Sequence, residues 1–314
     1  MRNSLAFIFS IAVAMWVTAE ASDYELEVLS EPLEHPWSIA FLPDGGMLVT
    51  ERPGRLRVID SNGLRSTPVA GIPEVFSSGQ AGLLDVLLAE DFKDSGTLFL
   101  SFAYGNSDAK HTRIFRARFN GKELLEVKPI FTTKPPKSGD AHYGGRMAWM
   151  DGGTLLIGTG DGFCFREESQ NLESHLGKII RIRDDGTVPD DNPFVNTTNV
   201  KPEIYSYGHR NVQAIVNYHC RGVIYAHEHG PRGGDELNII LPGRNYGWPV
   251  ISYGKESSSL RHWVRNQFGG SRCWTRMQRV SKIFCSRSSS SESGICGPVR
   301  TVLFTWLPTS PMGS

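Results

Sequence analysis

The sequence lacks three features that would place it in common functional classes. Its 314 residues hold 33 Lys or Arg and 33 Asp or Glu, so the chain carries no net charge. Such a balance gives no reason to expect nucleic acid or an anionic membrane surface as a partner. The five cysteines include no pair with the Cys-x-x-Cys spacing of a metal site. Helical periodicity is nearly absent after residue 21, so strands should form most of the fold.

The N-terminus carries the one long apolar run, from Leu5 to Val17. A run of about 13 residues is too short to cross a bilayer comfortably, which argues against a membrane anchor. Arg2 precedes the run, and Ala19-Glu20-Ala21 follows it with the small-x-small pattern of a cleavage site. We therefore expect residues 1–21 to be a secretory signal peptide. The mature chain would then be periplasmic or secreted, without a membrane span.

Short apolar runs separated by Asp-Gly, Asn-Gly and Pro turns dominate the rest of the chain, a pattern typical of all-β proteins. A loose repeat runs through them. Residues 39–60 resemble residues 147–162 followed by residues 176–186, and residues 96–121 form a weaker copy. The first two copies have an apolar strand, an Asp-Gly-Gly turn and a second apolar strand, followed after a loop by a strand that starts with glycine and a basic residue. Repeated small sheets of this kind favour a β-propeller, with a β-sandwich as the alternative.

Residues 256–314 break the repeat and are rich in Ser, Arg and Cys. From Ser257 to Ser314 there are eight Lys or Arg but one acidic residue, Glu292, although the whole chain is balanced. A disordered basic tail would have this composition. A change of reading frame near Ser257 would also produce it, and the abruptness of the change favours that explanation. We expect residues 22–255 to form the folded domain and residues 256–314 to be an aberrant tail.

His142 is the first candidate for chemistry. It precedes Gly144, Gly145 and Arg146 at the entrance to an apolar run. A histidine there can act as a base near neutral pH, and the glycines allow a ligand or another backbone to approach closely. A histidine with a purely structural role would have the same local sequence.

Two later segments add polar groups of another kind. Arg210 offers a planar fork of donors for carboxylates, and Asn211 can both donate and accept. Residues 227–249 combine the bend Gly230-Pro231 with acidic residues, and carboxylate and carbonyl oxygens in such a loop suit a hard cation such as calcium. Alternatively, these are solvated surface groups.

Taken in order, seven segments resemble one family. They are EHPWSIAFLPDG, GQAGLLDV, AHYGGR, LGKIIRI, GHRN, EHGPRGGDELN and NYGWPVISYG. Over about residues 24–255 the chain resembles the soluble aldose sugar dehydrogenases of the glucose/sorbosone dehydrogenase family. The resemblance implies an all-β, six-bladed β-propeller that uses pyrroloquinoline quinone (PQQ) and Ca²⁺. It also implies oxidation of an aldose sugar at C1 to its lactone, with electrons passed on to an external acceptor.

The same resemblance implies roles for individual residues. His142 would be the general base at the sugar C1 hydroxyl, and Arg210 would act beside it at the quinone. The expected contacts of PQQ are Gln80, Arg210 and Asn211. The expected calcium ligands are the carbonyls of Gly230 and Pro231, with Glu236 and Tyr246 at a second, structural calcium.

The chain departs from the family pattern after residue 255, where further blades would follow. Ser257 stands about where the family has another tyrosine contact of PQQ. A propeller without its last blades exposes sheet edges, so we expect this chain to be incomplete, and to fold poorly or bind PQQ weakly. Two other functions remain open: a calcium-dependent propeller lactonase, which would need no PQQ, and a propeller binding module without catalysis.

Overall fold

The computed structural model of the protein describes residues 25–65, 67–255, 282–287 and 301–305. The all-β prediction is confirmed, since only three short helical turns accompany the strands of these residues. The turns are α1 (Phe92–Ser95), η1 (Arg166–Ser169) and η2 (His219–Arg221). None of the helices in these described ranges has the length and apolar character that crossing a bilayer requires.

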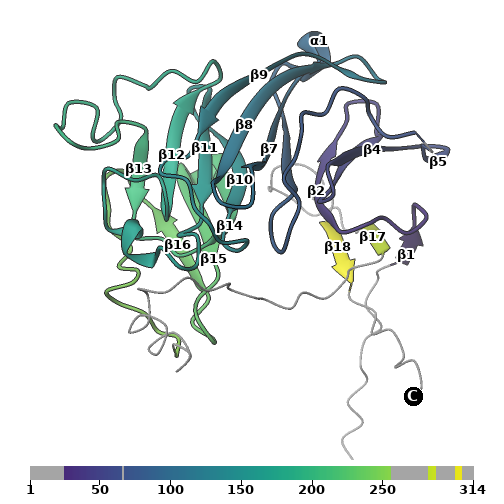
Figure 1. Ribbon diagram of the computed structural model, residues 1–314. Coiled ribbons are helices and arrows are strands. Elements are labelled where there is room, and N and C mark those ends of the chain that lie inside the picture. Colours follow the sequence, from purple (N-terminus) through teal and green to yellow (C-terminus); the bar gives the residue numbers. More distant parts are fainter. Residues whose placement is uncertain (1–24, 66, 256–281, 288–300, 306–314) are drawn as a thin grey trace, which may run out of the picture.

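Four antiparallel sheets follow one another along the chain and are arranged as the blades of a propeller (Figure 1). Each sheet is a meander, as the repeats in the sequence predicted. The first blade contains β2 (Pro36–Phe41), β3 (Met47–Glu51), β4 (Arg55–Asp60) and β5 (Gly63–Leu64). The second contains β6 (Leu83–Leu88), β7 (Thr97–Gly105), β8 (Lys110–Phe119) and β9 (Leu124–Thr132). The third contains β10 (Gly144–Met150), β11 (Thr154–Thr159), β12 (Lys178–Arg183) and β13 (Ile204–Tyr207). The fourth contains β14 (Val212–Tyr218), β15 (Val223–Glu228) and β16 (Glu236–Ile240).

A fifth sheet joins the two ends of the chain. β1 (Glu25–Val28) pairs with β17 (Lys282–Arg287), which pairs with β18 (Thr301–Thr305), both antiparallel. Figure 1 shows these C-terminal strands beside β1, next to the first blade. The sequence pattern predicted no such strands in residues 256–314. The proposed signal peptide and most of that tail lie outside the described residues, so their assignment stays a prediction.

Apolar side chains pack between neighbouring blades, and the first three sheets are covered on both faces. The fourth sheet buries one face and leaves Val216, Leu237 and Ile239 exposed on the other. β11 shows the principle, because all six of its residues are buried. Leu155 and Ile157 face the second blade and pack with Phe99 and Ile114, whereas Leu156 faces the fourth blade and packs with Val212. Successive side chains of a strand point to opposite faces, so one strand contributes to two cores.

The Asp-Gly turns connect strands within a blade, as the sequence predicted. Leu42 and Gly46 close the turn between β2 and β3 with an N–H to carbonyl bond of 2.8 Å, and Gly45 within it has a φ of 90°. Gly152 takes the same left-handed conformation between β10 and β11, with a φ of 89°. A residue with a Cβ adopts such angles rarely, which explains the glycines.

A register shift recurs at the start of the innermost strand of each blade. It lies between Pro36 and Ile39 in β2, between Leu83 and Val86 in β6, between Gly144 and Met147 in β10, and between Val212 and Ala214 in β14. A β-bulge redirects the side chains around it. The four shifts therefore bring residues of β2, β6, β10 and β14 to one end of the central region, where the strands contact one another.

Two leucines test how far stability depends on packing between blades. Leu155 is fully buried, whereas Leu237 is 72% exposed. Leu155→Ala should lower the free energy of unfolding by about 2–5 kcal/mol, because it removes packing and leaves a cavity. Leu237→Ala should change it by less than about 0.5 kcal/mol. Urea unfolding followed by tryptophan fluorescence measures the free energy of unfolding of both variants. Equal midpoints would contradict the idea that β11 stabilises the cores on both of its faces.

Candidate functional site

An open cavity of about 350 Å³ lies where the innermost strands begin. Its lining residues are polar or aromatic: Trp37, Gln80, Arg146, Asn211, Gln213 and His229. Gln80 and Asn211, both predicted from the sequence, are among them. The volume is at the lower end of the range of about 300–1,000 Å³ that is usual for small-molecule sites.

Arg146 ties the four innermost strands together at this cavity. Its Nη1 donates to Asp85 Oδ1 of β6 at 3.3 Å, and its Nη2 donates to the Trp37 carbonyl of β2 at 3.1 Å. Its Nε donates to the Gln213 carbonyl of β14 at 3.0 Å. Asp85 also accepts the N–H of Met147 at 2.7 Å. The guanidinium, which itself lines the cavity, thus fixes the positions of the neighbouring strands there.

His142 is buried in the loop between β9 and β10 with a φ of 54°, a left-handed conformation that is unusual for a residue with a side chain. Three contacts hold its backbone there. Its N–H donates to Gln80 Oε1 at 2.8 Å, and its carbonyl accepts from Gly162 N at 3.3 Å and from Lys137 Nζ at 3.1 Å. Gln80 and Lys137 therefore determine where the His142 ring lies.

The His142 ring forms a pair with a buried carboxylate, Asp161. His142 Nδ1 lies 2.7 Å from Asp161 Oδ1, which also accepts the N–H of Phe163 at 2.7 Å. The other oxygen, Oδ2, accepts from Trp248 Nε1 at 2.8 Å. Because a carboxylate oxygen accepts, the proton between the pair belongs to Nδ1, and Nε2 is left as the basic nitrogen. Sequence reasoning missed Asp161, although its place directly after a buried strand was visible in GTGDG.

Burial and neighbouring charges set the protonation state of this pair. Burial lowers the pKa of His142 below its ordinary value, more than Asp161 raises it, so the imidazole is neutral at pH 7. Burial alone would raise the pKa of Asp161, but His142 and the Phe163 N–H outweigh it and lower that pKa. A neutral imidazole held by an ionised carboxylate is the state that a general base requires.

Lys137 is a buried lysine that the sequence reasoning also missed. Its Nζ donates to the carbonyls of Ala141 and His142 and lies 3.3 Å from the centre of the Tyr143 ring. Burial lowers the pKa of Lys137 to about 7, although Asp161 opposes that shift. The side chain supports the loop that carries His142.

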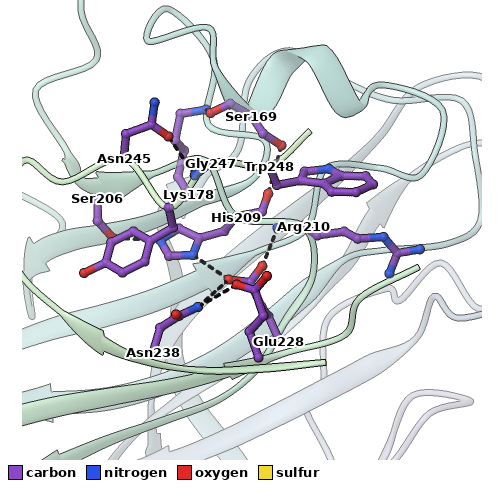
Figure 2. A network of polar contacts seen from close by, with 12 residues as sticks. Ser169, Lys178, Ser206, His209, Arg210, Glu228, Asn238, Asn245, Gly247 and Trp248 are labelled. Carbon is purple, nitrogen blue, oxygen red and sulfur yellow. Dashed lines mark hydrogen bonds and ion pairs between the residues drawn. The ribbon is translucent and has the colours of Figure 1, made fainter. Parts of the chain in front are cut away.

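A second polar network lies behind Arg210, and Figure 2 shows it. Glu228 is buried and accepts from the backbone N–H of Arg210, from Asn238 Nδ2 at 3.1 Å and from His209 Nδ1 at 3.0 Å. Burial alone would raise the pKa of Glu228, but His209 and these donors lower it. This network fixes the backbone of Arg210 and Asn211.

Arg210 and Asn211 face different partners at the site. Arg210 Nη1 donates to the His229 carbonyl at 2.8 Å, and its guanidinium lies 5.3 Å from the centre of the Trp248 ring. Asn211 Oδ1 accepts from Gly144 N at 3.2 Å and so connects β14 to the His142 loop. The Arg210 carbonyl accepts from Asp161 N at 2.8 Å, so the two residues lie next to the His142–Asp161 pair.

Of the residues expected to bind calcium, Gly230 and Pro231 lie in the loop between β15 and β16, Glu236 begins β16, and Tyr246 follows that strand. Gly230 donates its N–H to Asp235 Oδ1 at 2.9 Å, and Pro231 is buried. Glu236 Oε2 accepts from Asn238 at 3.1 Å. Tyr246 stacks on His209, and its hydroxyl donates to the Ile239 carbonyl at 2.7 Å. Glu236 and Tyr246 therefore do not share a hydrogen-bond partner among the residues that the structure describes. Oxygen atoms that could ligate a cation are nevertheless frequent in this part of the chain.

Comparison with protein-family models matches residues 33–272 to the glucose/sorbosone dehydrogenases. An uncharacterized protein of Synechocystis is 42% identical over 260 residues, covering 77% of this chain and 63% of that protein. The aldose sugar dehydrogenase YliI of Escherichia coli is 38% identical over 264 residues, covering 83% of this chain and 71% of that enzyme. The chain therefore spans less than two thirds of the length of the first of these relatives.

Solved structures agree in fold. The soluble aldose sugar dehydrogenase of Escherichia coli, in its apo form, is 40% identical with a TM-score of 0.72, over 75% of this chain and 69% of that one. The PQQ-bound aldose sugar dehydrogenase of Streptomyces coelicolor is 33% identical with a TM-score of 0.64, over 76% of this chain and 70% of that one.

Gly160 tests the close contact on which the position of His142 depends. A Cβ at Gly160 would lie 2.2 Å from the His142 carbonyl oxygen and 3.0 Å from Asn211 Oδ1. Gly160→Ala should therefore displace the His142 loop and lower the melting temperature by several degrees, since a ΔΔG of about 1–2 kcal/mol shifts it by roughly 2–8 °C.

Gly139→Ala is the matched control, because its added Cβ would make only an ordinary contact, 3.4 Å from the Gly162 carbonyl oxygen. Calorimetry compares the two variants with the parent. Equal melting temperatures for the two variants would show that the close contact between Gly160 and the His142 carbonyl does not constrain the fold.

Proposed function

Because the chain belongs to the glucose/sorbosone dehydrogenase family, we propose that it oxidises an aldose sugar at C1 to the lactone with PQQ as its cofactor. The His142–Asp161 pair beside a cavity lined with hydrogen-bond donors carries this proposal. The chain would pass electrons to an external acceptor and act in the periplasm or outside the cell. A six-bladed propeller would need more sheets than the four blades described.

His142 is the general base of the proposed reaction. Asp161 holds the proton on His142 Nδ1, so Nε2 is free to take the proton of the sugar C1 hydroxyl. The fixed backbone of the His142 loop keeps Nε2 at one position, which lowers the entropic cost of reaching the reactive geometry. PQQ, when bound, would supply the acceptor for the hydride of C1.

The donors around the cavity suit a planar anion such as PQQ, which carries three carboxylates. Trp37 Nε1 is buried and has no hydrogen-bond partner among the described residues, although Trp37 lines the cavity. A buried donor without a partner costs about 1–3 kcal/mol, which a ligand acceptor would recover. Gln80 and Asn211 add amide donors, and Arg210 and Arg146 add positive charge.

Calcium fits the loop after β15 by the chemistry of its donors. The carbonyls of Gly230 and Pro231 would hold the ion beside the cofactor, where its charge would favour electron density moving onto the quinone. Glu236 and Tyr246 would contribute to a second, structural calcium. Calcium prefers oxygen ligands from the backbone and from carboxylates, whereas softer metals prefer nitrogen and sulfur ligands.

The first test separates oxidation from hydrolysis and from simple binding. Reduction of an artificial dye should require both an aldose and PQQ, and His142→Asn should lower kcat by about 10²–10⁴-fold through loss of the base. Asparagine tolerates the left-handed backbone of this position, so the fold should survive. PQQ should still bind, measured by its absorption after gel filtration.

His219→Gln is the control for this test, because His219 is an exposed histidine paired with Asp151 away from the cavity. It should oxidise sugar at the parent rate. Hydrolysis of a sugar lactone without PQQ would instead favour the lactonase, and full activity of His142→Asn would remove His142 from the base role.

The pH profile tests the role of Asp161. Burial lowers the pKa of His142, so kcat/KM should be constant at neutral pH and fall as pH drops through a pKa below 6.5. Asp161→Asn removes the charge that raises the pKa of His142, so the acid limb should move to still lower pH. It should also lower the plateau, because an amide no longer fixes the proton on Nδ1. An unchanged profile and plateau would contradict the pairing.

A further inference from the structure

A cluster of three metal-binding side chains lies at the rim of the cavity, apart from the His142–Asp161 pair. His227 is in β15, His229 follows the end of that strand, and Asp235 precedes β16. One ring nitrogen of each histidine and one carboxylate oxygen lie within 4.8 Å of one another. We propose that His227, His229 and Asp235 bind one divalent transition-metal ion of the zinc class.

The backbone places the three side chains together before any ion binds. His227 and His229 are two residues apart along an extended segment, so their side chains point to the same side. The chain then turns back through Gly233 and Gly234, which have left-handed φ values of 85° and 72°. β15 and β16 pair in register, with His227 opposite Leu237, and this brings Asp235 beside the two histidines.

Two of the three ligands are also held by hydrogen bonds. His229 donates its N–H to the Asn211 carbonyl at 3.2 Å, and its own carbonyl accepts from Arg210 at 2.8 Å. Asp235 uses Oδ1 to accept from Gly230 N at 2.9 Å, so Oδ2 remains for an ion. An outer partner that orients a metal ligand is typical of zinc sites.

The distances require little movement. Ligand atoms about 2.0–2.1 Å from a tetrahedral zinc ion lie roughly 3.3–3.5 Å from one another. His229 Nδ1 and Asp235 Oδ2 are already 3.7 Å apart. The two histidine rings meet edge to face with centres 5.5 Å apart, and rotation of the half-exposed His227 ring closes the remainder.

The ligand types select the metal. Two imidazoles and one carboxylate match zinc and its neighbours in the first transition row, whereas calcium prefers a shell of oxygen atoms. Three protein ligands leave one position open to water. This site does not depend on the proposed oxidation, and it differs from the carbonyl oxygens proposed for calcium.

The test measures zinc binding to the untagged full chain, without PQQ and with calcium in excess. Isothermal titration with ZnCl₂ should show one equivalent bound. Co²⁺ in place of zinc should give the visible absorption bands of a tetrahedral ion. Removing a residue that only hydrogen-bonds to a metal ligand typically lowers metal affinity about 10–100-fold. His227→Gln and Asp235→Asn each remove a ligand itself, so each should weaken zinc binding by more than about tenfold.

His219→Gln and Cys220→Ser are the matched controls. His219 forms an exposed pair with Asp151 without a third ligand in the described part of the chain, and Cys220 is an exposed thiol that could bind zinc by itself. Both variants should keep the parent affinity. The proposal is overturned if either control abolishes binding, if His227→Gln leaves it unchanged, or if excess calcium displaces the zinc.

Discussion

Arg146 is the residue on which the geometry of the central region depends. Its three donor nitrogens reach the innermost strands of the other three described blades, at Trp37, Asp85 and Gln213. The guanidinium is a rigid, planar fork, so these bonds fix both distance and direction. They are available because each innermost strand is bulged where it begins. In regular strands without bulges, the accepting groups of Trp37, Asp85 and Gln213 would point into their own sheets and not toward Arg146.

The site beside Arg146 is a product of packing between blades. His142 belongs to the third blade, yet its backbone is held by Gln80, which precedes the second blade, and by the close approach of Gly160. Asn211, at the start of the fourth, bonds the same loop. The left-handed backbone of His142 costs free energy that these contacts must offset. The position of the base therefore depends on blades that meet only in the folded protein.

The sequence predicted the fold class and a good part of the site, for identifiable reasons. Asp-Gly turns between apolar runs are local signals, and they located strand pairs of the first and third blades correctly. Gln80, His142 and Asn211 stand in glycine-flanked loops with distinctive motifs. Trp37 and Arg146 were missed as site residues because they lie inside strand-like segments, where a bulge decides which way a side chain points. Asp161 was missed because its partner lies 19 residues away across a β-hairpin, a contact that no periodicity reveals.

Electrostatics explains why the carboxylates are buried around the cavity while hydrogen-bond donors line it. Asp85, Asp161 and Glu228 are all buried close to the cavity, and an unpaired carboxylate there would repel an anionic ligand. Each accepts hydrogen bonds from directed donors: Arg146 and Met147 for Asp85, His142 and Trp248 for Asp161, and His209 and Asn238 for Glu228. Their charge is used to orient the donors that hold the site. The cavity is lined by an indole, three amides, an imidazole and the guanidinium of Arg146, so a negatively charged planar ligand would meet hydrogen-bond donors there.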